Sequence, residues 1–328
     1  MVGETGPDKP LDVIFDTDLG VDDAMALLYL HASPHIKLRA ICTGVGNATV
    51  AMVTRNCLYI CERFGIEVPV YEGEGAGLDG TNRLPPPHMI HGDDGLGNIN
   101  PVVRNRTKES LSAADYIVEA INRAPGEITV VTVGRLTNFA LSLQRDPSIA
   151  SKVKDVVVMG GAIGRHGHAG NVSPVAEANV FGDPLAADQV FGANMTTAMV
   201  GLDVTQEVFM GEDYFAELRD ECGDAGRFIF DISRIYNGFH HEWKGLVGCY
   251  VHDSSATIYA VHPELFTVEK GQVRVQDAGV GAGQTIFSAG EQSWFVDEWR
   301  DRPQINVCTD VNAQAVLDDY MTVISRLT

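Results

Sequence analysis

The sequence lacks any long run of apolar residues, and this absence argues against a membrane-spanning protein. No segment of the chain reaches the roughly 20 consecutive apolar residues that a transmembrane helix needs. Residues 1–10 are polar and lack the basic-then-apolar order of a signal peptide. We therefore expect a cytoplasmic protein with no membrane partner.

Basic residues are scarce relative to acidic ones. The 328 residues include 24 Lys and Arg against 44 Asp and Glu, which gives a formal net charge of −20 at pH 7. Phosphate backbones are bound by clustered Lys and Arg, so this balance argues against a nucleic-acid partner. The same excess of acid repels an anionic membrane surface. Small neutral or metal-bound substrates are the partners that this charge favours.

Cysteine is also sparse and shows no disulfide pattern. Six cysteines are scattered through segments with a buried character, so free thiols are expected. Cys57 and Cys61 have the i,i+4 spacing that a metal site on a helix can use. No second pair accompanies them, which favours core packing over metal binding.

Apolar strand-like runs alternate with helical ones along most of the chain. This alternation is typical of βαβ units and predicts a single-domain α/β fold with a doubly wound, mostly parallel, Rossmann-like sheet. We expect a flexible segment at 1–10, one domain at 11–328, and a last strand and helix at 304–310 and 313–327 that close the sheet. The earlier segments are 13–15, 24–31, 38–43, 50–64, 68–71, 113–123, 128–133, 138–143, 153–159, 185–191 and 196–202.

Four carboxylates crowd the turn after the first apolar run. Asp16 and Asp18 follow the strand-like residues 13–15, and Asp22 and Asp23 open the next helix. A helix N-terminus favours carboxylates, but capping explains only one or two of them. Clustered carboxylates repel each other unless a cation lies among them, and a set made only of oxygen ligands indicates Ca²⁺ or Mg²⁺.

Polar residues and glycines also follow the later strands, where ligands of such folds bind. Asn47 comes after 38–43, Gly134 after 128–133, and Met159-Gly160-Gly161 after the valine-rich strand.

Residues 74–106 form a long loop, which is either a lid or binding loop or a flexible surface excursion. Residues 228–251 have a largely helical pattern, although their glycines weaken it.

These motifs together resemble the nucleoside hydrolases, calcium-dependent enzymes that cleave the N-glycosidic bond of ribonucleosides. The resemblance covers nearly the whole chain, and Leu19 departs from the proline usual at its position. The matching motifs, in the order of the family, are Asp16-Thr17-Asp18-Leu19-Gly20-Val21-Asp22-Asp23-Ala24, Val45-Gly46-Asn47, Gly160-Gly161, Ala176-Glu177-Ala178-Asn179 and Val251-His252-Asp253.

The resemblance implies a role for each matching residue. Asp18 would be both a calcium ligand and the base that activates the Ca²⁺-bound water, and His252 would protonate the leaving base. Asp23, Asp253 and the main-chain carbonyl of Val133 would complete the calcium ligands. The substrate-binding positions would be Asp22, Asn47, His91, Met159, Asn171, Glu177, Asn179, Tyr236 and His240. The family also implies a homodimer or homotetramer and a role in nucleoside salvage.

The base pocket contains the clearest departures from the family. Tyr236 and His240 occupy the positions of two tyrosines, and Lys244 stands where an arginine is frequent. These departures concern the residues that would recognise the leaving base. Trp243 either stacks on a base or packs in a core or interface, and His91 and His252 either contact the substrate or are structural.

Two other functions are compatible with parts of the sequence. The run Phe15-Asp16-Thr17-Asp18 also resembles phosphatases in which the first Asp is the nucleophile. That function requires a Lys-led motif before a later acidic pair that follows an apolar strand, and the sequence contains no clear example of this arrangement. A calcium-dependent nucleoside-binding protein without turnover would use most of the same residues. Such a protein would need His252 least, yet the chain retains it.

Overall fold

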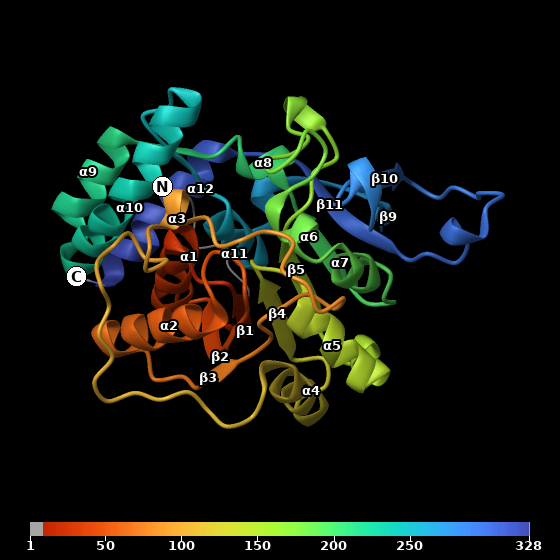
Figure 1. Ribbon diagram of the computed structural model, residues 1–328, viewed down its shortest axis with the longest axis horizontal. Helices are drawn as coiled ribbons and strands as arrows, with labels where there is room; N and C mark the ends of the chain where they lie inside the picture. The colour runs from red at the N-terminus through yellow and green to blue at the C-terminus, as the bar shows by residue number, and fades with distance from the viewer. Residues whose placement is uncertain (1–8, 328) are drawn as a thin grey trace.

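Nine of the strands in the described part of the chain form one sheet (Figure 1). The computed structural model describes residues 9–327, so residues 1–8 of the expected flexible segment lie outside the described range. The strands are β1 (Leu11–Thr17), β2 (Ile36–Thr43), β3 (Val70–Glu72), β4 (Ile128–Thr132), β5 (Asp155–Met159), β6 (Thr197–Val200), β9 (Phe266–Val275), β10 (Thr285–Ala289) and β11 (Gln304–Val311).

The sheet is mostly parallel, as the sequence predicts. Its strand order is β10-β9-β11-β6-β5-β4-β1-β2-β3. Neighbours from β11 to β3 run parallel, and β9 pairs antiparallel with both β10 and β11. Outside this sheet, β7 (Phe209–Gly211) and β8 (Gly248–Tyr250) form an antiparallel pair.

Helices cover both faces of the sheet (Figure 1). The chain contains α1 (Val21–Ala32), α2 (Val50–Phe64), α3 (His88–His91), α4 (Ala113–Arg123), α5 (Thr137–Arg145), α6 (Ala178–Gly182), α7 (Pro184–Phe191), α8 (Leu202–Thr205), α9 (Glu212–Glu221), α10 (Gly223–Lys244), α11 (Asp253–Val261) and α12 (Ala313–Ile324). Within residues 9–327, none of them has the length and hydropathy to cross a membrane.

Two hydrophobic cores lie on opposite faces of the sheet because side chains alternate along each strand. Val13 and Phe15 pack into the core beneath α1, α2, α10, α11 and α12, whereas Ile14 packs into the core beneath α4, α5 and α7. All six cysteines are buried and unpaired, in agreement with the expected free thiols. Cys57 and Cys61 belong to the first core, as predicted.

Three predictions about individual elements were wrong in detail. The helix expected at 228–251 ends at Lys244, because Gly245 has a φ of 66° and closes it in the left-handed conformation. The strand expected at 68–71 is β3, which begins two residues later, at Val70, and ends one residue later, at Glu72. Strand β11 does not close the sheet but lies between β6 and β9, because the hairpin of β9 and β10 continues the sheet beyond it.

The strand order reverses direction between β1 and β4. Strands β2 and β3 extend the sheet on one side of β1, and β4, β5 and β6 extend it on the other. Parallel sheets bind ligands at such a switch point, beyond the carboxyl ends of the strands. Asp18 follows β1 and Val133 follows β4, so the fold places both at this crevice.

Candidate active site

Hydrogen bonds hold the carboxylates at the end of β1 and in the turn that follows it. Asp16, at the end of the strand, accepts a hydrogen bond from Asn138 Nδ2 at 2.8 Å, and burial raises the pKa of Asp16 to about 7. Asp22 and Asp23 lie in the first turn of α1, where the helix dipole favours acids. The N–H of Gly20 donates to Asp23 Oδ2 at 2.8 Å, which fixes the start of the helix.

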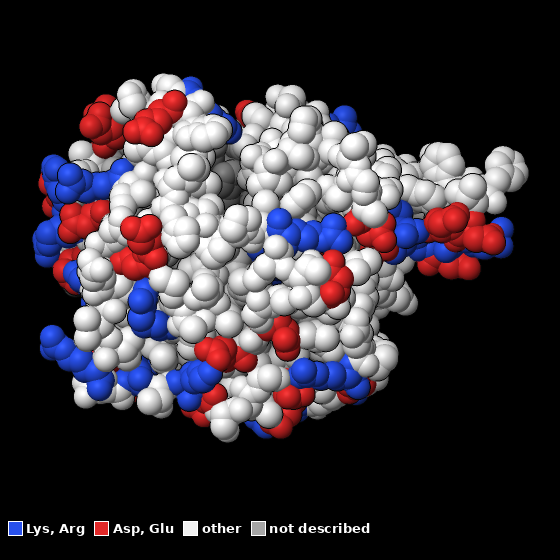
Figure 2. Space-filling view, viewed as in Figure 1, with Lys and Arg blue, Asp and Glu red and all other residues white. Residues whose placement is uncertain are grey.

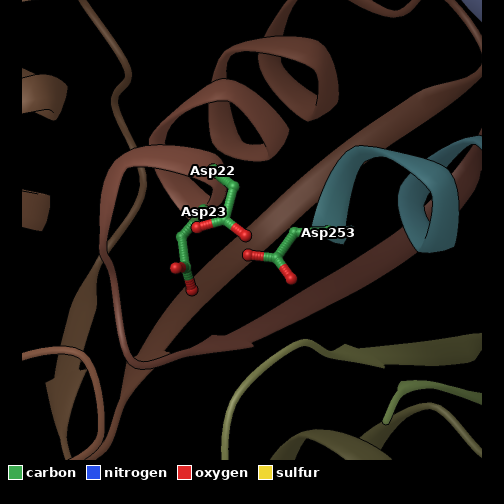
Figure 3. Close-up of side chains that lie close together, drawn as sticks. All are labelled: Asp22, Asp23 and Asp253. Atoms are coloured by element: carbon green, nitrogen blue, oxygen red, sulfur yellow. The ribbon is translucent and has the colours of Figure 1, made fainter. Parts of the chain in front are cut away.

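Three buried carboxylates converge from the N-termini of two helices (Figure 3). Asp22 and Asp23 of α1 and Asp253 of α11 each offer an oxygen, and these oxygens lie within 4.8 Å of one another. Burial and then repulsion by the neighbouring acids raise the pKa of Asp253 well above its usual range and that of Asp22 to about 7. Asp22 Oδ1 is buried without a hydrogen-bond partner among the described residues. A hard cation relieves the repulsion and supplies the missing partner, so the cluster fits a metal ion.

Asp18 lies beside this cluster and is joined to it by Asn47. The backbone N–H of Asn47 donates to Asp18 Oδ2 at 3.0 Å. Its side-chain amide donates to Asp18 Oδ1 at 3.3 Å and to Asp23 Oδ2 at 2.9 Å. Burial and the charge of Asp23 raise the pKa of Asp18 well above its usual range, which makes this carboxylate a stronger base. Asp18 is not one of the three converging acids, so its role as a metal ligand stays a prediction.

The ends of β4 and β5 meet at the side chain of Asn179. Its amide donates to the carbonyl oxygen of Val133 at 2.7 Å and to that of Met159 at 3.2 Å. Glu177 caps α6 by accepting the N–H of Asn179 at 2.8 Å, and it also accepts the N–H of Gly161 at 3.0 Å. The carbonyl of Val133 keeps a second lone pair, so a metal contact at this oxygen also stays a prediction.

One cavity of about 360 Å³ unites these groups, a size suited to a small-molecule ligand. Asp23 is fully buried beneath it. The loop 74–106 supplies one wall through residues 84, 85, 87, 90 and 91, which supports the binding-loop interpretation. The predicted site residues in the lining are Asp18, Asp22, Asn47, His91, Val133, Met159, Asn171, Glu177, Asn179, Tyr236, His240, His252 and Asp253.

Helix α10 and the start of α11 also line the cavity. Tyr236 donates its hydroxyl to Asp22 Oδ2 at 3.3 Å, which connects α10 to the acidic cluster. His252 Nδ1 lies 2.8 Å from Thr205 Oγ1. Burial, followed by the nearby His240, lowers the pKa of His252 to about 3, so the free ring is neutral at pH 7.

His91 is buried on α3, so it is not the solvated loop histidine that the sequence also allowed. The N–H of Val21 donates to His91 Nδ1 at 3.2 Å, which leaves the ring proton on Nε2. Burial lowers the pKa of His91 to about 3. Its ring lies 5.3 Å from that of Tyr236, centre to centre. The substrate contact expected of His91 stays a prediction.

Several residues in the lining were not predicted from the sequence. Arg135 directly follows the glycine after β4, a position that could have been recognised, and its guanidinium donates to the carbonyl of Leu84 at 3.1 Å. Phe239 directly precedes His240, and Tyr250 lies two residues before His252. Gln206 follows α8 with no sequence signal. Trp243 lines the cavity and is 67% exposed, so packing in a core was the wrong interpretation.

The surface charge agrees with a small-molecule site. On the face shown in Figure 2, basic side chains are interspersed with acidic ones.

A parallel sheet with an acidic cluster and a small cavity at its switch point defines an α/β enzyme that acts on a small polar substrate. A family model described as inosine-uridine preferring nucleoside hydrolase matches residues 13–318, and the chain belongs to this family.

Individual relatives agree over nearly the full length. The chain is 39% identical over 307 residues to probable uridine nucleosidase 1 of Oryza sativa subsp. japonica, covering 93% of this chain and 94% of the relative. It is 33% identical over 281 residues to the inosine-uridine preferring nucleoside hydrolase of Crithidia fasciculata, covering 84% and 87%. A solved plant nucleoside hydrolase superposes with a TM-score of 0.93 at 34% identity, covering 96% and 99%. The protein is therefore a hydrolase of ribonucleoside N-glycosidic bonds and not a phosphatase.

Proposed function

We propose that this enzyme cleaves ribonucleosides to ribose and free base with the help of a bound Ca²⁺ ion. The observation that carries the proposal is the convergence of buried carboxylates on a nucleoside-sized cavity. Asp18, Asp23, Asp253 and the carbonyl of Val133 would hold the ion, because they offer only oxygen ligands. When bound, the ion supplies a positive charge that orients the ribose hydroxyls and the attacking water.

Asp18 then removes a proton from the attacking water. Its buried carboxylate is fixed by Asn47 and has a raised pKa, which are the properties of a positioned general base. Asp22, Glu177 and Asn179 bind the ribose hydroxyls. Bond cleavage gives the ribose an oxocarbenium-like positive charge, and the surrounding carboxylates stabilise that charge.

His252 assists the departure of the base. If Thr205 donates to Nδ1, the ring proton resides on Nε2, from which His252 donates a hydrogen bond to the base. Negative charge develops on the base as the bond breaks, and this charge raises the proton affinity of the ring. His252 is therefore neutral in the free enzyme. As the bond breaks, the ring takes up a proton from solvent and passes a proton from Nε2 to the leaving base, which returns the ring to its neutral form.

Product analysis tests this function. Inosine and uridine are incubated with the protein and Ca²⁺, and hypoxanthine, uracil and ribose are measured by chromatography. We expect equal amounts of base and ribose, and an Asp18→Asn variant that still binds inosine but turns it over at least about 100-fold more slowly. Binding of nucleosides without any product from the wild-type protein would instead indicate a binding protein.

Three further properties belong to the proposal, of which the family resemblance supports the oligomeric state. We propose that the enzyme works in the cytoplasm as a homodimer or homotetramer, with residues 11–328 as its catalytic domain. Sedimentation of the purified protein measures the assembly state, and a monomer at micromolar concentration contradicts that part of the proposal.

A further inference from the structure

Arg135 connects the carboxyl edge of the sheet to the loop 74–106. It follows Gly134 in the short connection from β4 to α5, lines the cavity and is only 7% exposed. Burial lowers the pKa of Arg135, and the negative charges of Asp18 and Asp183 oppose this shift. The guanidinium stays protonated at neutral pH. A buried positive charge therefore lies in the wall of the cavity, near the carboxylate of Asp18.

The hydrogen bonds of Arg135 go to the loop and not to an acid. Nη1 donates to the side-chain oxygen of Asn82, and Nη2 donates to the carbonyl oxygen of Leu84 at 3.1 Å. No carboxylate among residues 9–327 forms a salt bridge with Arg135. A guanidinium is a planar fork that can bind two acceptors at once in a fixed arrangement. Arg135 therefore binds the loop at two points that lie two residues apart.

The fold leaves room for this side chain at Gly182, the last residue of α6. A Cβ added at Gly182 would lie 2.4 Å from Nε of Arg135 and 2.8 Å from its Cδ, and real Cβ atoms essentially never approach closer than 3.0 Å. An alanine at 182 would therefore displace Arg135 without removing its guanidinium.

The contact lies beside the part of the loop that faces the cavity. Leu84, Pro85 and Pro87 all line the cavity. Within residues 9–327, the one other hydrogen bond that joins residues 79–87 to a residue outside the loop runs from Arg83 Nη1 to the carbonyl oxygen of Asp277, at 3.0 Å. The position of this wall of the cavity therefore depends largely on Arg135.

We infer that Arg135 is a positioning residue, which holds residues 82–87 of the loop as a preformed wall of the cavity. A wall that is in place before the nucleoside enters reduces the conformational freedom that is lost on binding. Arg135 acts through the loop and takes no part in bond cleavage. The inference rests on the proposed nucleoside hydrolysis, because the nucleoside is the molecule that this wall would contact.

Hydrogen exchange of the free protein and steady-state kinetics with inosine test this role together. In Arg135→Met, the backbone amides of residues 78–84 should exchange about tenfold or more faster, because hydrogen bonds from a charged donor hold the loop closed. KM for inosine should rise about tenfold and kcat should change less than threefold, which is the pattern of lost ground-state binding. Arg135→Lys keeps the charge but loses the fork, so it should behave like Arg135→Met. Gly182→Ala should shift exchange and KM in the same direction.

A second variant and a control complete the test. Asn82→Ala removes one acceptor from an exposed position, so it should leave the fold intact and raise KM about threefold. The double variant with Arg135→Met should be no worse than Arg135→Met alone, because both changes remove the same contact. Arg104→Met removes an exposed arginine of the same loop that does not line the cavity, and it should leave exchange and kinetics unchanged.

Three results would overturn the inference while the function stands. They are wild-type exchange in a folded Arg135→Met variant, faster exchange with an unchanged KM, and wild-type values in Arg135→Lys, which would show that the charge alone matters. If the wild-type protein binds inosine without hydrolysing it, the proposed function fails, and the dissociation constant of inosine replaces KM in the same comparison. No binding of inosine at all would overturn both.

Discussion

An alanine at position 46 is expected to disable Asp18 while leaving the protein folded. A Cβ added at Gly46 would lie 1.6 Å from Asp18 Oδ2 and 2.6 Å from its Cγ. Real Cβ atoms essentially never approach closer than 3.0 Å, so the carboxylate oxygen has to retreat by about 1.4 Å, the difference between the two distances. A misplacement of about 1 Å in a catalytic group can lower a rate on the order of 100-fold. We therefore predict a loss in kcat/KM of about 100-fold or more, equivalent to about 2.7 kcal/mol of barrier.

A neighbouring glycine gives the matched control. A Cβ added at Gly44 would meet only Asn138 Nδ2, at 3.5 Å, an ordinary contact. Neither glycine has a positive φ, so alanine strains neither backbone. Ribose release from inosine gives kcat/KM for both variants, and thermal unfolding checks that both remain folded. Gly44→Ala should retain wild-type activity. A folded Gly46→Ala enzyme with wild-type kcat/KM would refute the catalytic role of Asp18 at this position.

Three other perturbations test the remaining parts of the site. Asp253→Asn removes one of the converging carboxylates, so the Ca²⁺ concentration for half-maximal activity should rise at least about tenfold; an unchanged Ca²⁺ titration would argue against a metal contact. His252→Ala should slow inosine hydrolysis about 100-fold or more, but p-nitrophenyl riboside hydrolysis far less, because that leaving group needs no proton; equal losses on both substrates would contradict an acid role. The enzyme should hydrolyse 2′-deoxyinosine about tenfold or more slowly than inosine, because Asp22 and Asn179 lose a hydroxyl partner; comparable rates would exclude that contact.

The central part of the fold was predictable because its strands are buried on both faces. Strands β1, β4 and β5 appear in the sequence as continuous apolar runs, which is typical of parallel sheets covered by helices. The hairpin of β9 and β10 escaped prediction for the opposite reason. Its residues are partly exposed and polar, with charges such as Glu269 and Lys270 within the strand.

That the polar residues after β1, β4 and β5 line one cavity was also predictable, because the ends of parallel strands meet at one edge and their polar residues can be read from the sequence. The arrangement of the cavity wall formed by α10 depends on details of helix geometry. The accepting nitrogen of His240 is set by a hydrogen bond to the carbonyl one turn earlier, and the position of Lys244 is set by the end of the helix at Gly245. Asp22 was expected to contact the ribose, but it lies in the cluster with Asp23 and Asp253. The N-termini of α1 and α11 meet there, which the sequence alone does not reveal.

Ribose release from inosine and uridine, measured by a reducing-sugar assay before chelation, after chelation and after Ca²⁺ is returned, tests the central claim most directly. The buried carboxylates predict that activity disappears on chelation and returns with Ca²⁺. Full activity in the chelated protein would contradict the calcium site, and no ribose under any of the three conditions would contradict the hydrolysis itself.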